Sequence, residues 1–346
     1  MIERSPLRLP TPSQPVRVGW PVRTQVLGCG LAALLMVAGC GAPPPNDPSD
    51  PPSLDETDLD GDSGSSASPE VEEAARAIES GDFDHARAKL EAVLAKAPED
   101  AQANYYYALV QEQAGDAQAA AKHYLAALKS DPKLPEAAVN LSSLVLEGQP
   151  EQALKVVEQA LSHTPGHPGL LLNHALVLEA LGRQEEALVA YGKAVQADPD
   201  NSELRFAYGD LLAAAGKNEE AKRELMAIVT DDVKVLGAVG AVLGKVEAFA
   251  ECVAVLDKAI KESPLPQLFV RRAACKNGLK DIDGATRDYK EAIQLEPESA
   301  AGHLYLGRHL ASAGKKAEAR ASLQQAVKID GDGKVGQAAK ELLKKL

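Results

Sequence analysis

The 346-residue chain is poor in the side chains that many metal and redox sites require. It contains 4 cysteines and 7 histidines, and only 4% of its residues are aromatic. It is also short of positive charge, because 37 Lys and Arg stand against 50 Asp and Glu, a net charge of −13. Such an excess of acid opposes electrostatic binding to nucleic acid or to an anionic membrane surface. We therefore expect no nucleic-acid partner.

The spacing of potential metal ligands does not predict a metal site. His163 and His167 are separated by Thr-Pro-Gly, so they would not share a helix face as zinc ligands four residues apart normally do. The acidic segment 58–62 begins like a calcium-binding loop. Ser63 and Pro69 then replace the glycine and the glutamate that such a loop needs. We expect no bound metal.

Catalytic motifs are equally scarce. The glycines and the lysine of residues 237–245 do not form a phosphate-binding loop, because Val239 and Val246 stand where a glycine and a hydroxyl residue are needed. A Ser/His/Asp or Cys/His site would have no second domain to hold it. We therefore expect a chain that is not an enzyme and that uses no cofactor.

An uncharged, mostly apolar run of fourteen residues occupies positions 26–39, after Arg17 and Arg23. It is too short to span a bilayer as a helix, and it has the length of a signal-peptide core. The run leads into the tetrapeptide VAGC at residues 37–40. This tetrapeptide resembles the lipobox of bacterial lipoproteins.

The lipobox resemblance implies that residues 1–39 are a signal peptide and that the thiol of Cys40 receives a diacylglyceryl group after cleavage. It therefore places the protein in the bacterial cell envelope, anchored by lipid, at the outer membrane facing the periplasm. An uncleaved anchor and a chance cysteine at this place are the alternatives.

Residues 40–66 have the composition of a tether. From position 41 to 66 the chain is rich in Pro, Ser, Gly and Asp, with seven acids and no Lys or Arg. Low hydrophobicity with charge of one sign predicts disorder.

From residue 67 the sequence becomes a regular repeat. A small residue recurs eight times at intervals of 31 to 34 residues, at Ala86, Ala120, Ala153, Ala187, Ala221, Cys252, Ala285 and Ala319. A fixed period in this range marks a solenoid, in which each unit must stack on its neighbours to bury its apolar face. We predict about eight helix-turn-helix units over residues 67–333.

Other positions repeat in register with the small residue. Five residues before it stands a glycine suited to the left-handed turn that ends a helix, as at Gly81, Gly115, Gly182, Gly216 and Gly314. Four residues after it comes an apolar or aromatic residue, one helical turn along the same face. Twelve residues after it, six units carry a proline that would close the second helix.

This combination resembles the tetratricopeptide repeat, a helix-turn-helix of 34 residues. The resemblance covers residues 67–333 and implies an all-α fold, an α-solenoid of about eight repeats forming a right-handed superhelix. Residues 334–346 carry apolar side chains on one face of a short helix. We expect this helix to cap the exposed end of the stack.

Three repeats depart from the pattern, and the third has lost a residue around positions 146–148. The fifth lacks the closing proline and has a shortened exit near residues 230–233, and the sixth carries Gly237, Gly240 and Gly244 in its first helix. Glycine weakens a helix by about 1 kcal/mol relative to alanine where no packing compensates. We predict a soft joint at residues 230–246.

The two cysteines of the repeats allow two interpretations. Cys252 stands at the small-residue position, which favours a small apolar filler at a helix crossing. A disulfide with Cys275 is the alternative in an oxidising compartment, and spacing does not decide between them.

The family resemblance also predicts a peptide-binding site. In proteins of this family, fixed positions of each first helix line a concave groove. Carried over to this chain, the predicted binding residues are Tyr105, Tyr106, Leu109, Asn140, Leu172, Asn173, Leu176, Phe206, Asp210, Arg271, Tyr305 and Arg308. Most are apolar or aromatic.

Two polar features of this groove suggest how a peptide would be held. Asn140 and Asn173 occupy the same position in successive repeats, and a carboxamide offers both donor and acceptor to a peptide backbone. Acids occupy the groove positions of units one to five and bases those of units six to eight, a gradient that would orient a ligand. Solvated asparagines and solvated helix ends are the alternatives.

Two functions remain open. The first is a membrane-anchored scaffold that binds protein or extended peptide on its concave face and assists assembly of a secretion, pilus or outer-membrane complex. The second is an accessory subunit that binds a polysaccharide or a lipid-linked substrate by stacking on the groove aromatics. The sequence does not identify the partner or the oligomeric state.

Overall fold

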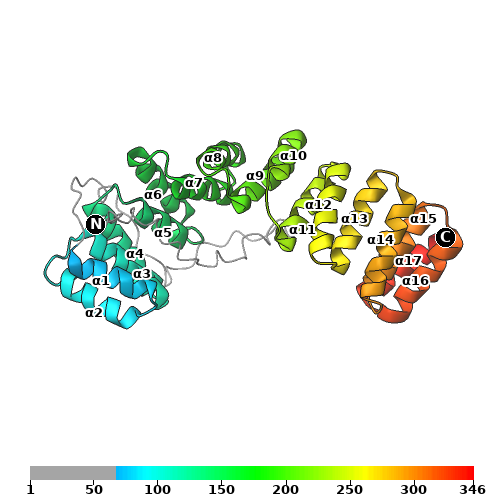
Figure 1. The fold of residues 1–346 in the computed structure, drawn as a ribbon, viewed down its shortest axis with the longest axis horizontal. Helices are drawn as coiled ribbons and strands as arrows, with labels where there is room; N and C mark the ends of the chain where they lie inside the picture. The colour runs from blue at the N-terminus through cyan, green and yellow to red at the C-terminus, as the bar shows by residue number, and fades with distance from the viewer. Residues whose placement is uncertain (1–67) are drawn as a thin grey trace, which may run out of the picture. The chain divides into compact units, whose positions relative to one another are not determined.

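A computed structural model describes residues 68–346. The predicted signal peptide, the lipidation site at Cys40 and the acidic tether lie outside the described residues. Within residues 68–346 the chain forms 17 α-helices and no strand (Figure 1). This confirms the prediction of an all-α fold.

The helices follow one another in antiparallel pairs. The chain divides between Asn173 and His174 into two compact parts, each made of several repeats, which are called the first unit and the second unit from here on. The first unit contains α1 (Pro69–Glu79), α2 (Phe83–Leu94), α3 (Ala101–Gln113), α4 (Ala117–Ser130), α5 (Pro135–Val145), α6 (Pro150–His163) and the beginning of α7 (Pro168–Ala180). The second contains the rest of α7 and α8 (Gln184–Ala197), α9 (Ser202–Ala214), α10 (Asn218–Met226), α11 (Val233–Lys245), α12 (Phe249–Glu262), α13 (Pro266–Gly278), α14 (Ile282–Leu295), α15 (Ala300–Ser312), α16 (Lys316–Asp330) and α17 (Lys334–Lys345).

Left-handed residues end the first helix of most pairs, as the sequence predicts. The five glycines Gly81, Gly115, Gly182, Gly216 and Gly314 have φ between 71° and 82°. In two further pairs Glu247 and Lys280 take the same place at φ 61° and 63°. Glycine carries little penalty in this conformation, whereas other residues do. The repeat geometry thus holds where the glycine is missing.

The repeated small residues form the centre of each helix pair. All eight, from Ala86 to Ala319, are 0% exposed, and the side chains four residues later are at most 4% exposed. A small side chain at this place lets the two helices approach closely. Helix starts are also fixed locally, because the side chains of Asp82, Asp100 and Asp116 accept a hydrogen bond from the amide three residues on.

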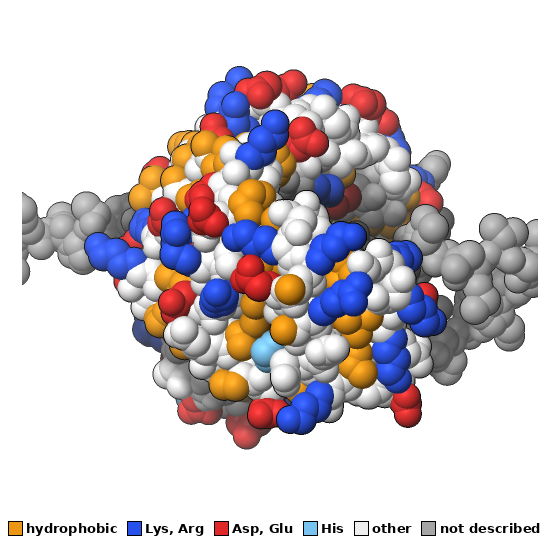
Figure 2. Space-filling view, turned by 90° about the vertical axis from the view of Figure 1, so that its right-hand side faces the viewer, with side chains coloured by type: hydrophobic (Ala, Val, Ile, Leu, Met, Phe, Trp, Pro, Cys, Tyr) orange, Lys and Arg blue, Asp and Glu red, His pale blue; other side chains and the backbone are white. Residues whose placement is uncertain are grey.

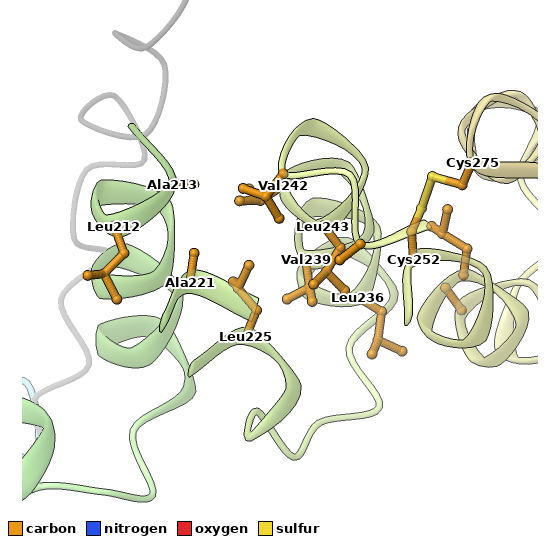
Figure 3. Packing of buried hydrophobic residues seen from close by; sticks show 14 of the residues in the cluster. Leu212, Ala213, Ala221, Leu225, Leu236, Val239, Val242, Leu243, Cys252 and Cys275 are labelled. Atoms are coloured by element: carbon orange, nitrogen blue, oxygen red, sulfur yellow. A yellow bond between two sulfur atoms is a disulfide. The ribbon is translucent and has the colours of Figure 1, made fainter. Parts of the chain in front are cut away.

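The glycine-rich helix α11 differs from the predicted weak element. A Cβ added at Gly240 would lie 2.6 Å from Leu256 Cγ, and one at Gly244 would lie 3.0 Å from Cys275 Sγ. The glycines therefore permit close approach of α12 and α13. One hydrophobic cluster runs from α8 through α11 to α13 (Figure 3). This packing removes one reason for the soft joint at residues 230–246, which stays a prediction; in the loop before α11, Val229 is 89% exposed.

Cys252 of α12 and Cys275 of α13 form a disulfide, with a Cα–Cα distance of 6.3 Å (Figure 3). The interpretation favoured by the sequence, a small apolar filler, is therefore incomplete for Cys252. The residue fills the crossing at 0% exposure and also bonds to the first helix of the next repeat.

The last helix packs on the final pair. Leu342, Leu343 and Leu346 contact the cluster formed by Leu323, Ala326 and Ala339. The side chain of Asp330 accepts hydrogen bonds from the amides of Val335 and Gly336 at 2.9 and 3.0 Å and so fixes the start of α17. Across residues 68–346 we find no helix with the length and apolar character needed to cross a bilayer.

Candidate peptide-binding site

The predicted binding residues lie on first helices of the pairs and fall into two sets. In the first unit, Tyr105, Tyr106 and Leu109 lie on α3, Asn140 on α5, and Leu172 and Asn173 on α7. In the second unit, Leu176 lies on α7, Phe206 and Asp210 on α9, Arg271 on α13, and Tyr305 and Arg308 on α15. Asn173 is buried, Asp210 and the two arginines are exposed, and the others are half-buried. These half-buried side chains remain accessible in part to a ligand.

In the first unit the tyrosines form a compact aromatic cluster. The ring centroids of Tyr105 and Tyr106 are 5.1 Å apart with an interplanar angle of 60°. Tyr105 also packs at 6.1 Å against Tyr124 of α4, which is 0% exposed. Tilted pairs at these distances are favourable for aromatic rings. The buried ring thus supports the two half-buried ones.

Hydrogen bonds hold the cluster in place. Tyr124 Oη donates to Glu112 Oε2 at 2.7 Å, and Asn140 Nδ2 donates to Tyr124 Oη at 3.2 Å. The same pairing recurs in the second unit, where Tyr191 Oη donates to Glu179 Oε2 at 2.7 Å. Each tyrosine stands four residues after the small residue of its repeat. The pairing therefore links the two helices of a repeat from within.

Carboxylates act on the hydroxyl groups of Tyr105 and Tyr106. Burial raises the pKa of Tyr105, and the carboxylates of Glu136 and Glu112 raise it further. Burial also raises the pKa of Tyr106, with Glu79 and Glu136 adding to the effect. Both causes disfavour a phenolate, but burial opposes charge of either sign. The nearby carboxylates are the part that favours a positively charged ligand over a negatively charged one.

Asn173 has a different role from the one predicted. Its Nδ2 lies 2.8 Å from the carbonyl oxygen of Val139, 2.8 Å from Ser142 Oγ and 2.9 Å from Ser143 Oγ. The side chain is 7% exposed. Its two N–H groups are satisfied by α5 and are not available to a peptide backbone, so it joins α5 to α7. The predicted pair of peptide-binding carboxamides, Asn140 and Asn173, therefore loses the donor of Asn173.

In the second unit the arginines are held by neighbouring groups. Arg271 Nη1 on α13 donates to the carbonyl oxygen of Gly237 on α11 at 2.7 Å, so the bond joins the first helices of two successive repeats. Arg308 Cζ lies 5.5 Å from the ring centroid of Tyr305, a cation–π geometry. Phe206 packs against the hydrophobic cluster of α8–α13. Both guanidinium groups sit on exposed residues and are available to an anionic group.

Basic side chains are numerous at the C-terminal end of the second unit. Figure 2 shows many Lys and Arg side chains over this face, with fewer Asp and Glu. In the sequence, α17 alone carries Lys334, Lys340, Lys344 and Lys345 against one acid, Glu341. The second unit thus ends in a positively charged surface within an acidic protein.

One buried ionic network was not predicted. Arg272 of α13 donates from Nε and Nη2 to the two oxygens of Asp288 at 2.9 and 2.6 Å, and from Nη1 to Asp257 Oδ1 at 2.6 Å. Lys276 Nζ lies 2.8 Å from Asp288 Oδ2, and Asp288 is 3% exposed. The network links α12, α13 and α14. Its partners stand 15 or 16 residues from Arg272, a separation with no sequence signal.

His163 and His167, the histidines examined as metal ligands, lie at the ends of two different helices. His163 is the last residue of α6, and the Nδ1 of His167 accepts a hydrogen bond from the amide of Leu170 at 3.3 Å, at the start of α7. Over the described part of the chain no three His, Cys, Asp or Glu side chains are grouped to hold a metal ion.

Comparison with known families agrees with this architecture. A sequence model of the tetratricopeptide repeat matches residues 71–135, 142–202 and 278–334, and a second model of the same repeat matches residues 178–245. Together these matches extend over more than half of the chain. The chain belongs to the tetratricopeptide repeat family.

Individual relatives are distant. The human protein O-mannosyl-transferase TMTC1 is 27% identical over 173 residues, which are 48% of this chain and 19% of that protein. The chain thus spans about a fifth of the length of that curated relative.

Solved structures with a similar fold include a tetratricopeptide repeat protein from Parabacteroides merdae, at 21% identity and a TM-score of 0.46, covering 70% of this chain and 97% of that one. Another is YrrB, described as a TPR protein with an unusual peptide-binding site, at 20% identity and a TM-score of 0.43, covering 55% of this chain and 100% of that one.

Proposed function

We propose that this protein is a non-catalytic scaffold of the bacterial cell envelope that binds extended segments of partner proteins through its first helices. The observation that carries the proposal is that half-buried apolar and aromatic side chains stand on first helices in each unit, on α3 and α7 in the first and on α7, α9 and α15 in the second. Repeat solenoids use such extended surfaces for binding. Assistance to the assembly of a secretion, pilus or outer-membrane complex is the role we propose for it.

Two observations support the envelope location. The sequence VAGC at residues 37–40 supports a lipid anchor on Cys40, with the repeats on the periplasmic side of the outer membrane. The disulfide between Cys252 and Cys275 agrees with an oxidising compartment, because cytosolic thiols are kept reduced.

The alternative, binding of a polysaccharide or a lipid-linked substrate, has less support. Stacking on a sugar needs flat, exposed rings with polar groups beside them. Tyr105 is instead tilted against both Tyr106 and Tyr124, at 60° and 47°. This packing favours a peptide side chain over a sugar ring.

Site-directed photo-crosslinking in cells tests the proposal. A photoreactive amino acid is placed at Leu109 or Leu176 on first helices, and at Lys122 or Val189, which are exposed on second helices, as controls. We expect polypeptide adducts from the first-helix positions and few from the controls. Adducts of glycan or lipid-linked sugar, or equal adducts from all four positions, would contradict it.

The lipid anchor has its own test. A Cys40→Ser variant should lose labelling by a fatty-acid probe and should keep its signal peptide. A wild-type protein whose mature N-terminus is any residue other than Cys40 would refute the anchor while leaving the binding proposal intact.

A further inference from the structure

The tyrosine cluster of the first unit carries an inference about ligand chemistry. Tyr105 and Tyr106 are adjacent on α3, half-buried, with ring centroids 5.1 Å apart. Both rings therefore expose part of their surface. An exposed aromatic surface binds aliphatic groups and, through its quadrupole, cations.

Three carboxylates act on these two tyrosines. Burial apart, the main causes that raise the pKa of the two hydroxyl groups include the carboxylates of Glu79, Glu112 and Glu136. They come from α1, α3 and α5, so three successive repeats contribute. Within the described chain neither Glu79 nor Glu136 makes an ion pair with a Lys or Arg.

Tyr305 in the second unit can be compared with Tyr106 in the first. Tyr305 stands at the repeat position of Tyr106, fourteen residues before the small residue in each case. Arg308, three residues after Tyr305, places its guanidinium 5.5 Å from that ring. In the second repeat the equivalent residue is Leu109. Tyr305 thus receives a cation from its own helix, whereas Tyr106 has an apolar residue there.

We propose that Tyr105, Tyr106, Glu79 and Glu136 form a subsite for a lysine or arginine side chain of an extended partner segment. The methylene stem packs on the rings, and the cationic head lies between the two carboxylates. Long basic side chains bury the stem and keep the head near charge in this way. The inference rests on the proposed function and names the chemistry of its ligand in the first unit.

Binding of defined peptides to the full-length protein in detergent tests this subsite. The probes are three fluorescein-labelled nonapeptides of alternating leucine and serine that differ only in the central residue, which is lysine, norleucine or glutamate. Norleucine keeps the stem and removes the charge. We expect the lysine probe to bind about fivefold more tightly than the norleucine probe and the glutamate probe to bind most weakly.

Matched variants locate the effect. Glu79→Gln with Glu136→Gln should remove the preference for lysine and should leave norleucine binding unchanged. Glu99→Gln with Glu151→Gln, two exposed residues of the same unit, makes the same change of net charge and should keep the preference. Tyr106→Leu should reduce the preference, and Tyr106→Phe should retain it because the ring remains.

The outcomes separate the subsite from the proposed function. Equal binding of the lysine and norleucine probes by the wild-type protein overturns the subsite and leaves peptide binding standing. Equal loss of preference in the control pair also overturns it, since the effect is then one of net charge. Failure of all three probes to bind contradicts both proposals.

Discussion

At the scale of single residues, buried polar side chains link neighbouring segments through hydrogen bonds. Asn104 is 2% exposed, donates to the carbonyl oxygens of Pro98 and Asp100, and pairs through Oδ1 with His123 Nδ1 at 2.9 Å. Asn173 bonds to α5 in the same manner. These hydrogen bonds satisfy the polar atoms of the buried carboxamides themselves.

Asn173→Ala should therefore destabilise the fold. The substitution removes two hydrogen bonds that join α7 to α5 at a buried place, each worth about 0.5–1.5 kcal/mol, so we expect a loss of about 1–3 kcal/mol in the free energy of unfolding. Urea denaturation measures this change. Asn140→Ala, at a half-buried residue with one bond to Tyr124, should cost less. An Asn173 variant as stable as the wild type would show that the bonds to α5 contribute little.

His309 makes stability depend on pH. It is 4% exposed, its Nε2 lies 2.8 Å from Thr286 Oγ1, and its Nδ1 is buried without a hydrogen-bond partner. Burial lowers the pKa of His309 in the folded state. The unfolded chain then binds a proton more readily, so stability is lost as the pH falls below the unfolded pKa of about 6.5.

Thermal unfolding between pH 8 and pH 5 tests this dependence. A His309→Gln variant should lose less stability over this range than the wild type. His303→Gln, on the same helix at a half-buried place, should behave as the wild type does. Identical pH profiles for the wild type and the His309 variant would contradict the role of this residue.

At the scale of the helices, glycine marks where neighbours approach closely. Gly240→Ala would raise the helix propensity of α11 by about 1 kcal/mol. Its new methyl group would lie 2.6 Å from Leu256 Cγ, in a fully buried crossing. Overpacking of this kind costs about 1–3 kcal/mol, so we expect a net loss of stability.

Gly192→Ala on α8 is the matched control. The nearest atom to its new methyl group is Tyr208 Oη at 3.3 Å, the end of a side chain that can move. Here the gain of about 0.5–1 kcal/mol in helix propensity should prevail. Equal effects of the two substitutions in chemical denaturation would mean that packing at Gly240 is not limiting.

The periodic features of the helices were predictable from the sequence, whereas contacts between repeats were not. Gly81 and its equivalents are fixed by the local turn, and the small residues by the helix crossing, so both recur at a constant spacing. The bond from Asn173 to Val139 joins residues 34 apart on different helices. The same is true of the binding site. The repeat pattern predicts which residues lie on first helices, but it does not show which of their side chains form hydrogen bonds to a neighbouring repeat.

Two cases show what the sequence lacked. Cys252 matched the small-residue position, and its bond to Cys275 depends on how two successive repeats stack. The glycines of α11 read as a weakness because the side chains that fill the space above them come from α12 and α13. In both cases the missing information is the packing of one repeat against the next.

At the scale of the whole molecule the charge is unevenly distributed along the sequence. Carboxylates act on Tyr105 and Tyr106 of α3, and Asp210 stands on α9, whereas Arg271 and Arg308 stand on the later first helices α13 and α15. Complementary charge sets the direction of a bound chain and its rate of association more than its affinity. An extended partner should place a basic segment on the first five repeats and an acidic segment or its carboxyl terminus at Arg271 and Arg308.

The most direct test of binding through the first helices uses a partner that photo-crosslinking has identified and that has then been isolated. Its dissociation constant is measured for the wild-type protein and for two charge-reversed variants. Arg271→Glu with Arg308→Glu changes first helices, and Arg287→Glu with Lys290→Glu makes the same change of charge at exposed residues of the second helix α14. We predict that the first pair weakens binding by about 1–3 kcal/mol if its contacts are desolvated and mainly slows association if they lie at the rim, while the second pair leaves binding near the wild-type value. Equal effects of both pairs, or no effect of either, would contradict binding through the first helices.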